Sequence, residues 1–419
     1  MGSAVCMRKE SFMASRGQLY IEIADVLREE IRNGLYSDAM IKEKELQKRF
    51  EVSASTVKMA LVVLAKENLI TRIPGRGTFA RQIGPGAVLE EPIAPEKRIK
   101  TGLVGVLLPT MRGPVFNHLL YGILAEAPDH GMNPVIGLTG SSTQRETELI
   151  ARFHQLNVDG LLLWPAEGEQ YNDKLLQLHM SSFPMVLVDR WLPGLNISRV
   201  TADHRSGASE AARYLFELGH RKIAFLSVGS EYPDYTQSVN ERFLGFLDAY
   251  RETDGVQGGS VRWVRPYGAG EKMKEHIGWI AERLQEGPGV TAVLCVETYD
   301  LECVRRAAEG LGLTIPDDLS VIGFDGGSGE TDRMKGWTTH FGDKQWTWID
   351  QSEEQIGREA VRLLHDLIES ASEVRQVVIP TRLRPGDSAG YPSIARAHGI
   401  RSEPEGEKSS IVSSADERR

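Results

Sequence analysis

Residues 43–80 decide how the N-terminal part of this chain folds, and they read EKELQKRFEVSASTVKMALVVLAKENLITRIPGRGTFA. The pattern predicts a short helix over residues 43–50, a tight turn over 51–53 and a longer helix over 54–67. Two helices joined by so short a turn must cross steeply, so the second helix projects its outer face away from the first. The apolar positions of the second helix share the spacing of one buried face: Val57, Ala60, Leu61 and Leu64.

The outer face of the second helix carries Ser55, Thr56 and Lys58, which are small polar or basic residues with no acid among them. Hydroxyl groups and a Lys ammonium can meet phosphates and base edges, so this face suits the major groove of DNA. Ser53 stands directly before the helix. Its hydroxyl is expected to accept a hydrogen bond from a first-turn N–H and so to cap the helix.

A hairpin is expected after the second helix. Residues 69–73 and 78–80 read as two short strands, and the Pro-Gly-Arg-Gly turn between them places Arg76 at its tip. Because flanking glycines let the backbone approach closely, an Arg at such a tip suits a phosphate or a narrow minor groove. The segment therefore predicts a wing that accompanies a helix-turn-helix.

Charge supports this interpretation but does not decide it alone. Residues 42–81 hold nine Lys and Arg against four Glu, a net charge of +5, whereas the whole chain carries −9 and the remainder therefore −14. A solvated basic face on a small helical domain would give the same balance. Charge, turn, helix polarity and wing together favour binding of double-stranded DNA.

Residues 18–81 resemble the winged helix of the GntR family of bacterial transcription regulators. The match rests on Glu43-Lys44-Glu45-Leu46, on residues 52–61 against the family pattern V-S-R-x-T-V-R-x-A-L, and on Gly75-Arg76-Gly77-Thr78-Phe79 in the wing. Two family arginines are replaced, by Ala54 and Lys58, so a bidentate guanine contact is lost at 54 and the family's base preference is not carried over. The residues expected to contact DNA are Lys44, Ser53, Ser55, Thr56, Lys58, Arg72, Arg76 and Gly77.

The whole chain has the composition of an ordinary globular protein. Its 419 residues are 41% hydrophobic and 26% charged, and no apolar run reaches the roughly 18 residues of a membrane span. The first residues lack the apolar segment of a secretory signal and the three Cys show no metal-ligand spacing, so a reducing cytoplasm is expected. The expected divisions are a disordered arm (1–16), the winged helix (17–81), a Pro- and Gly-rich linker (82–98), an α/β domain (99–386) and a disordered tail (387–419).

Continuous apolar segments alternate with helical patterns throughout residues 99–386. Strands that are apolar along their whole length are typical of parallel sheets covered by helices on both faces. About 280 residues is long for one such layer, so the predicted fold class is α/β, with two doubly wound lobes around a cleft and a winged helix-turn-helix before them. The chain is expected to cross between the lobes near residues 200–203, 324–329 and 337–349.

Residues 99–386 resemble the effector-binding domain of the LacI/GalR family, which shares the two-lobed fold of periplasmic sugar-binding proteins. The combined resemblance is to a GntR winged helix fused to a LacI-type sensor, as in bacterial arabinose repressors. It implies a repressor whose operator affinity responds to a small-molecule effector, expected to be a carbohydrate. The stretches that carry the match are Val200–Gly207, Leu218–Phe225, Ile315–Asp325 and Ile356–Ala360.

Ligands of open α/β sheets lie beyond the carboxyl ends of the strands, and several polar residues follow such ends in this sequence. Asp and Arg can hold vicinal hydroxyls in a fixed geometry, and an aromatic face can stack on sugar C–H groups. Core packing remains the alternative for the aromatic candidates, and an internal salt bridge for Arg242 and Asp325. The resemblance places these residues at the family's effector contacts: Phe116, Arg190, Ser238, Arg242, Tyr267 and Asp325.

Two departures from that family concern the effector. The family has Asn-Asp after the strand over residues 292–296, whereas this chain has Glu297-Thr298. An acceptor-only carboxylate replaces an amide, so the effector is expected to present additional donors at Glu297, or a cation. The Gly-rich loop over 326–329 lacks the Lys and the spacing of a phosphate-binding loop and is interpreted as a flexible connection between the lobes.

Two rival functions fit part of the sequence. An enzyme on the same α/β fold is disfavoured because no nucleotide-binding, nucleophile-elbow or metalloprotease motif occurs. A solute-binding receptor without a DNA role leaves the winged helix unexplained. No cofactor, metal ion or membrane partner is expected; the expected partners are operator DNA, the effector and a second copy of the chain, since a homodimer formed by residues 99–386 would match a near-palindromic operator.

Overall fold

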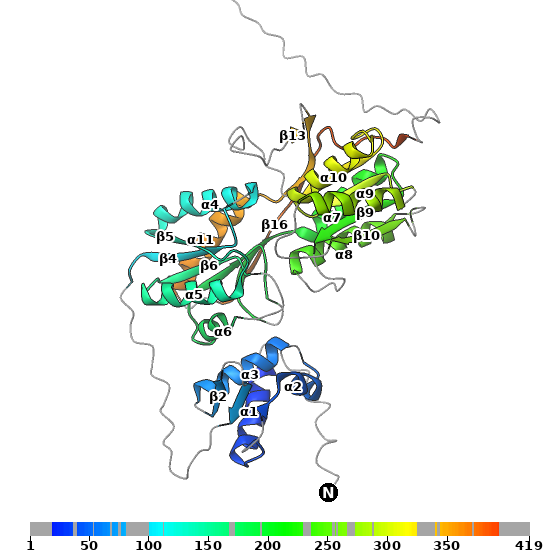
Figure 1. Cartoon of the computed structure of the whole chain (residues 1–419). Coiled ribbons are helices and arrows are strands. Elements are labelled where there is room, and N and C mark those ends of the chain that lie inside the picture. The colour runs from blue at the N-terminus through cyan, green and yellow to red at the C-terminus, as the bar shows by residue number, and fades with distance from the viewer. Residues whose placement is uncertain are drawn as a thin grey trace, which may run out of the picture.

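Three parts follow one another along the chain in the computed structural model: a small helical part at the N-terminal end and then two α/β lobes (Figure 1). The expected arm (1–16) and linker (82–98) lie outside the residues that the structure describes. Those are residues 19–36, 40–52, 54–67, 69–73, 77–80, 100–111, 113–166, 172–192, 195–228, 236–253, 256, 259–265, 273–286, 289–324, 340–341, 344–370 and 373–393.

The N-terminal part is a winged helix, as the sequence predicts. Its strands pair antiparallel in the order β1-β3-β2, with Ile73 opposite Gly77 next to the hairpin tip. The inner faces of its helices bury one apolar cluster that includes Leu27, Leu46 and Leu61. The elements are α1 (Leu19–Arg32), β1 (Met40–Ile41), α2 (Glu43–Phe50), α3 (Ala54–Lys66), β2 (Ile70–Ile73) and β3 (Gly77–Ala80).

The first lobe is a six-stranded parallel sheet in the order β16-β8-β7-β6-β4-β5. Its strands are β4 (Leu103–Leu108), β5 (Asn133–Leu138), β6 (Gly160–Leu163), β7 (Met185–Val188), β8 (Ser198–Ala202) and β16 (Gln376–Ile379). Its helices are α4 (Pro114–Glu126), the 3-10 helix η1 (Ala127–His130), α5 (Thr143–Gln155), α6 (Asp173–Met180) and α11 (Glu353–Glu369).

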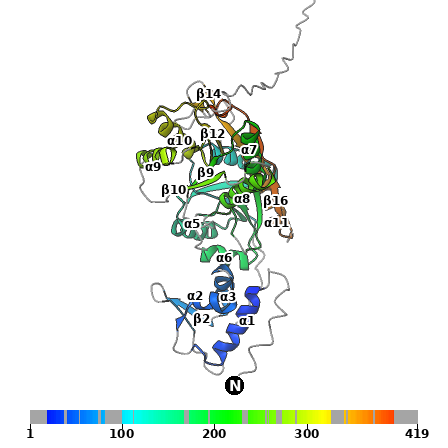
Figure 2. The same ribbon diagram turned by 90° about the vertical axis from the view of Figure 1, so that its right-hand side faces the viewer.

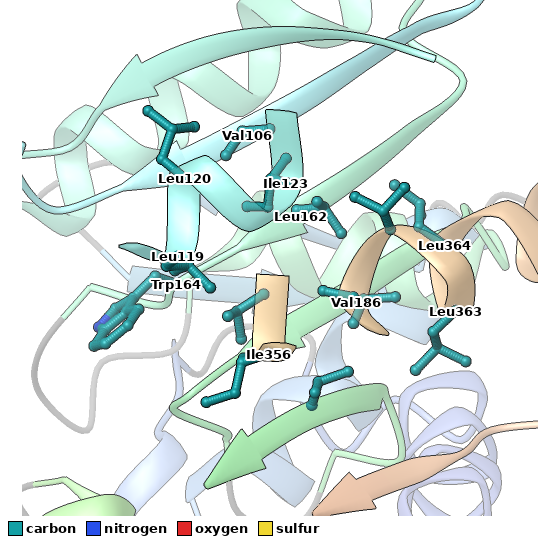
Figure 3. Packing of buried hydrophobic residues seen from close by; sticks show 14 of the residues in the cluster. Val106, Leu119, Leu120, Ile123, Leu162, Trp164, Val186, Ile356, Leu363 and Leu364 are labelled. Atoms are coloured by element: carbon teal, nitrogen blue, oxygen red, sulfur yellow. The ribbon is translucent and has the colours of Figure 1, made fainter. Parts of the chain in front are cut away.

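Helices cover both faces of the first sheet, which is why its strands are apolar throughout. Leu162 points to the face covered by α4 and α11, where Figure 3 shows it near Ile123 and Leu364. Its neighbour Leu161 points to the opposite face, covered by α5 and α6. The helices α4 and α11 pack backbone against backbone: a Cβ on Gly122 would lie 2.1 Å from the Glu354 carbonyl oxygen.

The second lobe has a sheet of the order β10-β9-β11-β12-β15-β17, parallel except for β17 at the edge. The helices α7 and α8 cover one face, and α9 and α10 the other. Its strands are β9 (Ile223–Val228), β10 (Ser260–Arg265), β11 (Ala292–Cys295), β12 (Ser320–Phe324), β15 (Thr347–Asp350) and β17 (Arg382–Arg384), with a separate hairpin of β13 (His340–Phe341) and β14 (Lys344–Gln345). Its helices are α7 (His204–Glu217), α8 (Gln237–Glu252), α9 (Met273–Glu286) and α10 (Thr298–Gly310).

Within the described residues the chain passes between the lobes at three places, and the sequence located one of them. It leaves β8 for α7 at residues 202–203, as expected. The predicted crossings near 324–329 and 337–349 lie largely outside the described residues; β12 before them and β15 after them pair in the same sheet. The chain instead returns to the first lobe after β15, at residues 351–352, and leaves it again between β16 and β17, at 380–381.

Ordered structure continues past the expected end of the effector domain at residue 386. Ser388 is fully buried: its Oγ donates to the Val321 carbonyl at 2.6 Å and accepts from the Thr347 N–H at 2.8 Å. The Gly390 N–H donates to Ser320 Oγ at 3.0 Å. The described residues up to 393 therefore form part of the second lobe, while the remainder of the expected tail lies outside them.

No helix in the part of the chain that the structure describes is both long and apolar enough to cross a membrane.

Candidate DNA-binding and effector sites

The recognition helix of the winged helix is α3, and its inner face is fixed by Val57, Leu61 and Leu64 in the apolar cluster. An ion pair secures its far end, because the Arg28 guanidinium meets both carboxylate oxygens of Glu67 at 2.6 Å. This pair ties α1 to the residue that follows α3. The helix is therefore held in a fixed orientation, with the opposite face turned away from the domain.

Several basic residues of the winged helix are already paired within it. Arg49 meets the Glu30 carboxylate, and Lys42 Nζ lies 2.8 Å from Glu45 Oε1. Lys44 is exposed and Lys58 half-buried, and neither forms an ion pair within the described part of the chain. Both ammonium groups can therefore meet an outside anion.

The other predicted DNA contacts can be placed only in part. Thr56 is half-buried in the first turns of α3, beside Lys58. Gly77 begins β3 opposite Ile73. Ser53 and Arg76 lie outside the described residues, as do the side chains of Ser55 and Arg72, so these DNA contacts stay predictions.

The sequence interpretation missed Met59. This residue lies on the outer side of α3, between Val57 and Leu61, yet only 2% of it is exposed. Its neighbours are not the winged-helix core but the cluster of α5 and α6 in the first lobe, including Leu175 and Leu176. The apolar side chain beside Ser55 and Lys58 on the outer face was the available signal.

The carboxyl ends of the first sheet bring together an aromatic pair and an Arg. Phe116 is half-buried in α4, after β4, and its ring centroid lies 4.9 Å from that of Trp164, which follows β6. The Arg190 guanidinium, after β7, lies 5.6 Å from the centre of the Trp164 ring. The two predicted residues thus meet through Trp164, which the sequence interpretation did not select.

Arg242 occupies the corresponding end of the second lobe and is only 5% exposed. Its Nη1 donates to the Val296 carbonyl, its Nη2 to Gln351 Oε1 at 2.8 Å and its Nε to His204 Nδ1 at 3.3 Å. The guanidinium also lies 4.1 Å from the centre of the Phe324 ring. These bonds go to neutral acceptors; the internal salt bridge considered as the alternative for Arg242 and Asp325 cannot be placed, because Asp325 lies outside the described residues.

Asp189 links this Arg to the first lobe. It follows β7, is 5% exposed and has a φ of 61°, in the left-handed region that Asp tolerates better than most residues. Its Oδ1 lies 3.4 Å from Nε2 of His204, the first residue of α7. Burial would raise the pKa of the Asp189 carboxyl, but His204, Arg242 and Arg190 together hold that pKa below its usual value.

These contacts join the two lobes at their strand ends. Asp189 belongs to the first lobe, His204 and Arg242 to the second, and Gln351 lies where the chain crosses back. The two ring nitrogens of His204 face opposite partners, Nδ1 towards Arg242 Nε and Nε2 towards Asp189. We call this set, Asp189, His204, Arg242 and Gln351, the interlobe network.

Glu297 is part of a second buried charge cluster, around Arg265 at the end of β10. Arg265 Nη2 donates to Glu297 Oε1 at 3.0 Å, and Nε donates to Asp300 Oδ1 at 3.1 Å. His276 Nε2 lies 3.3 Å from Arg265 Nη1, and Tyr299 lies beneath the guanidinium at 5.1 Å. Glu297 is the exposed member of this cluster, with 38% of its side chain accessible.

This cluster changes what the carboxylate at position 297 means for an effector. The sequence suggested that an acceptor-only Glu297 would call for extra donors or a cation. Arg265 balances that charge, which weakens the expected need for extra donors or a cation at position 297. Burial, followed by the nearby Glu297 carboxylate, raises the pKa of Asp300 to about 8 despite the Arg265 contact.

The remaining predicted effector residues differ in how far they can be placed. Ser238 is buried in the first turn of α8, four residues before Arg242 and hence on the same face of that helix. Tyr267 and Asp325 lie outside the described residues. Phe116 and Arg190 therefore lie against Trp164 in the first lobe, and Ser238 and Arg242 share a face of α8 in the second. The interlobe network connects the two lobes.

Comparison with known protein families finds a match in each half of the chain. Residues 19–80 match the bacterial regulatory proteins of the gntR family, and residues 212–389 match the periplasmic binding protein-like domain. The chain is a mixed α/β protein in which a gntR-type helix-turn-helix domain precedes two parallel-sheet lobes of the periplasmic-binding-protein type.

Two of the similar individual proteins are repressors by name. The arabinose metabolism transcriptional repressor of Geobacillus stearothermophilus is 25% identical over 337 residues, covering 79% of this chain and 85% of its own length. The HTH-type transcriptional repressor CytR of Escherichia coli K12 is 28% identical over 327 residues, covering 77% and 88%. Both alignments extend over most of each protein.

Solved structures support the fold of the two lobes. A putative ribose operon repressor from Burkholderia thailandensis is 26% identical and superposes with a TM-score of 0.57, covering 68% of this chain and 99% of that one. The regulator CelR in complex with cellobiose superposes with a TM-score of 0.58 over 89% of this chain and 99% of its own, at 21% identity. The second likeness concerns the fold alone.

Proposed function

We propose that this protein is a sequence-specific DNA-binding transcription repressor, acting in the cytoplasm, whose operator affinity is controlled by a small carbohydrate held between its two lobes. The observation that carries the proposal is the union of two features in one chain. A gntR-type winged helix precedes a domain whose two lobes meet at their strand ends through the interlobe network. The first feature suits DNA, and the second suits a small polar ligand.

On the DNA side, α3 and the wing supply the contacts. Lys58, Thr56 and Ser55 are proposed to enter the major groove, with Ser53 capping the helix. Lys44, Arg72, Arg76 and Gly77 are proposed to meet the backbone or the minor groove. The lack of an Arg at position 54 makes a bidentate guanine contact there impossible. Lys58 is therefore proposed to be the main basic side chain that contacts bases.

On the effector side, the two lobes offer complementary chemistry. The aromatic pair Phe116 and Trp164 can stack on the C–H face of a sugar. The hydroxyl groups of the sugar are proposed to form hydrogen bonds with polar residues of both lobes: Arg190, Ser238, Arg242, Tyr267, Glu297 and Asp325. A ligand bridging both lobes shifts their arrangement only if it binds one arrangement more tightly than the other.

The effector acts on DNA binding through the spacing of two winged helices. We propose a homodimer formed by the lobes. Two operator half-sites at a fixed distance bind most tightly to two recognition helices with the same spacing. Rearranging the lobes then misplaces the winged helices and lowers affinity. Sedimentation that shows a single chain on operator-length DNA would contradict this arrangement.

The proposed function is tested by fluorescence anisotropy with a DNA fragment from upstream of the protein's own gene. The expected result is binding at least 1,000-fold tighter than to scrambled DNA at the same salt concentration, an order-of-magnitude expectation for specific regulators. Arabinose, ribose and cellobiose, named for similar proteins, start a sugar panel in which one member should release the DNA. Equal affinity for both DNAs would contradict the proposal.

Two substitutions make the assay more specific. Lys58→Ala should weaken binding and alter base preference. Arg76→Ala should weaken binding with less change in preference and reduce the salt dependence by about one counterion. If both variants titrate like the wild-type protein, the helix and wing are not the DNA-binding surface.

A further inference from the structure

The recognition helix α3 has an apolar contact outside its own domain. Met59 is two positions from both Val57 and Leu61, which lie in the winged-helix core. Since successive residues of an α-helix are about 100° apart, Met59 points away from that core. It nevertheless is 2% exposed, because it packs within the apolar cluster of α5 and α6.

The face that Met59 occupies is the one proposed to read DNA. Ser55 lies four residues before it and therefore on the same side of the helix. Lys58 is its immediate neighbour in sequence. A major groove about 12 Å wide admits one α-helix, with that side inward. The contact and the DNA groove therefore compete for the same surface.

The partner surface is α6 in the first lobe, which contacts α3 directly. Figures 1 and 2 show α3 next to α6 from two directions. Leu175 and Leu176 of α6 are buried in the cluster that holds Met59, and Leu178 packs against it. Tyr20 of α1 packs against both this cluster and the winged-helix core, so the contact extends beyond a single side chain.

Hydrogen bonds fix the start of helix α6 to the rest of the first lobe. Asn172 caps it by accepting a hydrogen bond from the Lys174 N–H at 2.9 Å. Its side chain in turn donates to Glu146 Oε1 at 3.0 Å, and Glu146 Oε2 accepts from the Ala166 N–H at 2.7 Å. Glu146 is 3% exposed, so these bonds fix the start of α6 from inside the lobe.

We propose that α6 is a docking surface for the recognition helix of the same chain, and that the docked state cannot bind DNA. This inference rests on the proposed function, since it assigns a regulatory contact to the DNA-reading helix. The docked and the DNA-bound states exclude each other, so the apparent operator affinity equals the intrinsic affinity multiplied by the undocked fraction. Weakening the contact therefore increases DNA affinity.

The first test changes α6 and leaves every proposed DNA contact in place. Leu178→Asp puts a charge into the cluster around Met59, and we expect at least threefold tighter binding to the upstream DNA fragment without sugar. Leu156→Asp is the matched control, because Leu156 lies at the end of α5 in the same lobe and is 47% exposed. The control should bind DNA like the wild-type protein.

The second test needs no variant. Mild peroxide converts accessible Met to its sulfoxide, and mass spectrometry follows individual residues. In free wild-type protein Met59 should oxidise at least tenfold more slowly than Met40, which lies in the same domain and is 40% exposed. In Leu178→Asp the two rates should approach each other.

The outcomes separate this inference from the proposed function. A wild-type protein without preference for its upstream DNA refutes the proposed function. Specific DNA binding together with equal oxidation of Met59 and Met40 overturns only the docking contact. An unchanged affinity in a folded Leu178→Asp variant, with Met59 still protected, also overturns it, because the proposed contact would then tolerate a buried charge.

Discussion

The strand-end edges of the two lobes differ in chemistry although the lobes share one architecture. The first edge is aromatic: Phe116 and Trp164 lie against each other, with Arg190 beside them. The second edge is ionic, with Arg242 and Arg265 each holding several partners beneath the surface. An effector with an apolar face and a polar rim would satisfy both, which is the chemistry of a sugar ring.

The ionic edge is also the more preorganised of the two. Arg242 and Arg265 are each 5% exposed and bonded to backbone and side chains of neighbouring elements. Charges removed from water in this way are costly when they lose a partner. Stability should therefore depend on the second edge, and ligand selectivity on the first.

The largest expected effect comes from breaking the ionic edge. Arg265→Met removes the donor to two carboxyl groups, those of Asp300 and the partly exposed Glu297, and should destabilise the second lobe by about 3 kcal/mol. Arg262→Met, on the same strand, removes a guanidinium that lies over the Phe243 ring and should cost about 1 kcal/mol. Chemical denaturation measures both, and equal losses would contradict the assigned role of the cluster.

Asp300 predicts how the stability of the same edge depends on pH. Its pKa is about 8 in the folded state against 3.8 ordinarily, so between these values the folded protein holds a proton that the unfolded chain has lost. Stability must then fall as pH rises, by about 1 kcal/mol per unit near pH 7. Asp300→Asn, neutral and similar in shape, should flatten this slope in thermal melts from pH 6 to 8. An unchanged slope would show that Asp300 is ionised throughout.

The aromatic edge is tested through ligand affinity. Phe116→Leu removes the ring while keeping apolar volume, and should weaken sugar binding up to about tenfold, since aromatic contacts contribute up to roughly 1.5 kcal/mol beyond buried area. DNA affinity without sugar should stay the same. Tyr121→Leu is the control on the same helix, because Tyr121 is 61% exposed. Calorimetry that finds equal sugar affinities for the two variants would remove Phe116 from the site.

The smallest effect is expected at Arg190. Its guanidinium lies 5.6 Å from the centre of the Trp164 ring, a contact that contributes about 0.5–1 kcal/mol at an accessible position. Arg190→Met should therefore weaken sugar binding two- to fivefold, an estimate on the order of that energy. A loss of a hundredfold would instead make Arg190 a direct and dominant ligand contact.

The local parts of this fold could be predicted from the sequence. Continuous apolar runs such as residues 103–108 and 292–295 are parallel strands covered on both faces, and the spacing in α3 gave its buried side. The crossings could not be located in the same way. The strand β15 has the sequence TWID, which does not indicate whether it belongs to the first or the second sheet; in the structure it pairs with β12 in the second.

The sites show the same limit. Arg190, Ser238 and Arg242 were selected from their places after strands and from the family resemblance, and Phe116 from the resemblance alone. Asp189, His204 and Gln351 were not, because each is ordinary alone and their contact depends on how two lobes meet. Ser388 looked like part of a polar tail until two hydrogen bonds placed it inside the second lobe.

The central claim is that one ligand between the lobes and one DNA fragment on the winged helix influence each other. Binding linkage requires the influence to be reciprocal: a sugar that weakens operator binding by a given factor must itself bind more weakly, by the same factor, to the operator-bound protein. Titration calorimetry of the sugar selected in the panel, with and without saturating upstream DNA, measures this factor directly. We predict a loss of sugar affinity of about 5- to 150-fold, equal to the loss measured in the DNA titration. A sugar affinity that is the same with and without DNA would contradict the account.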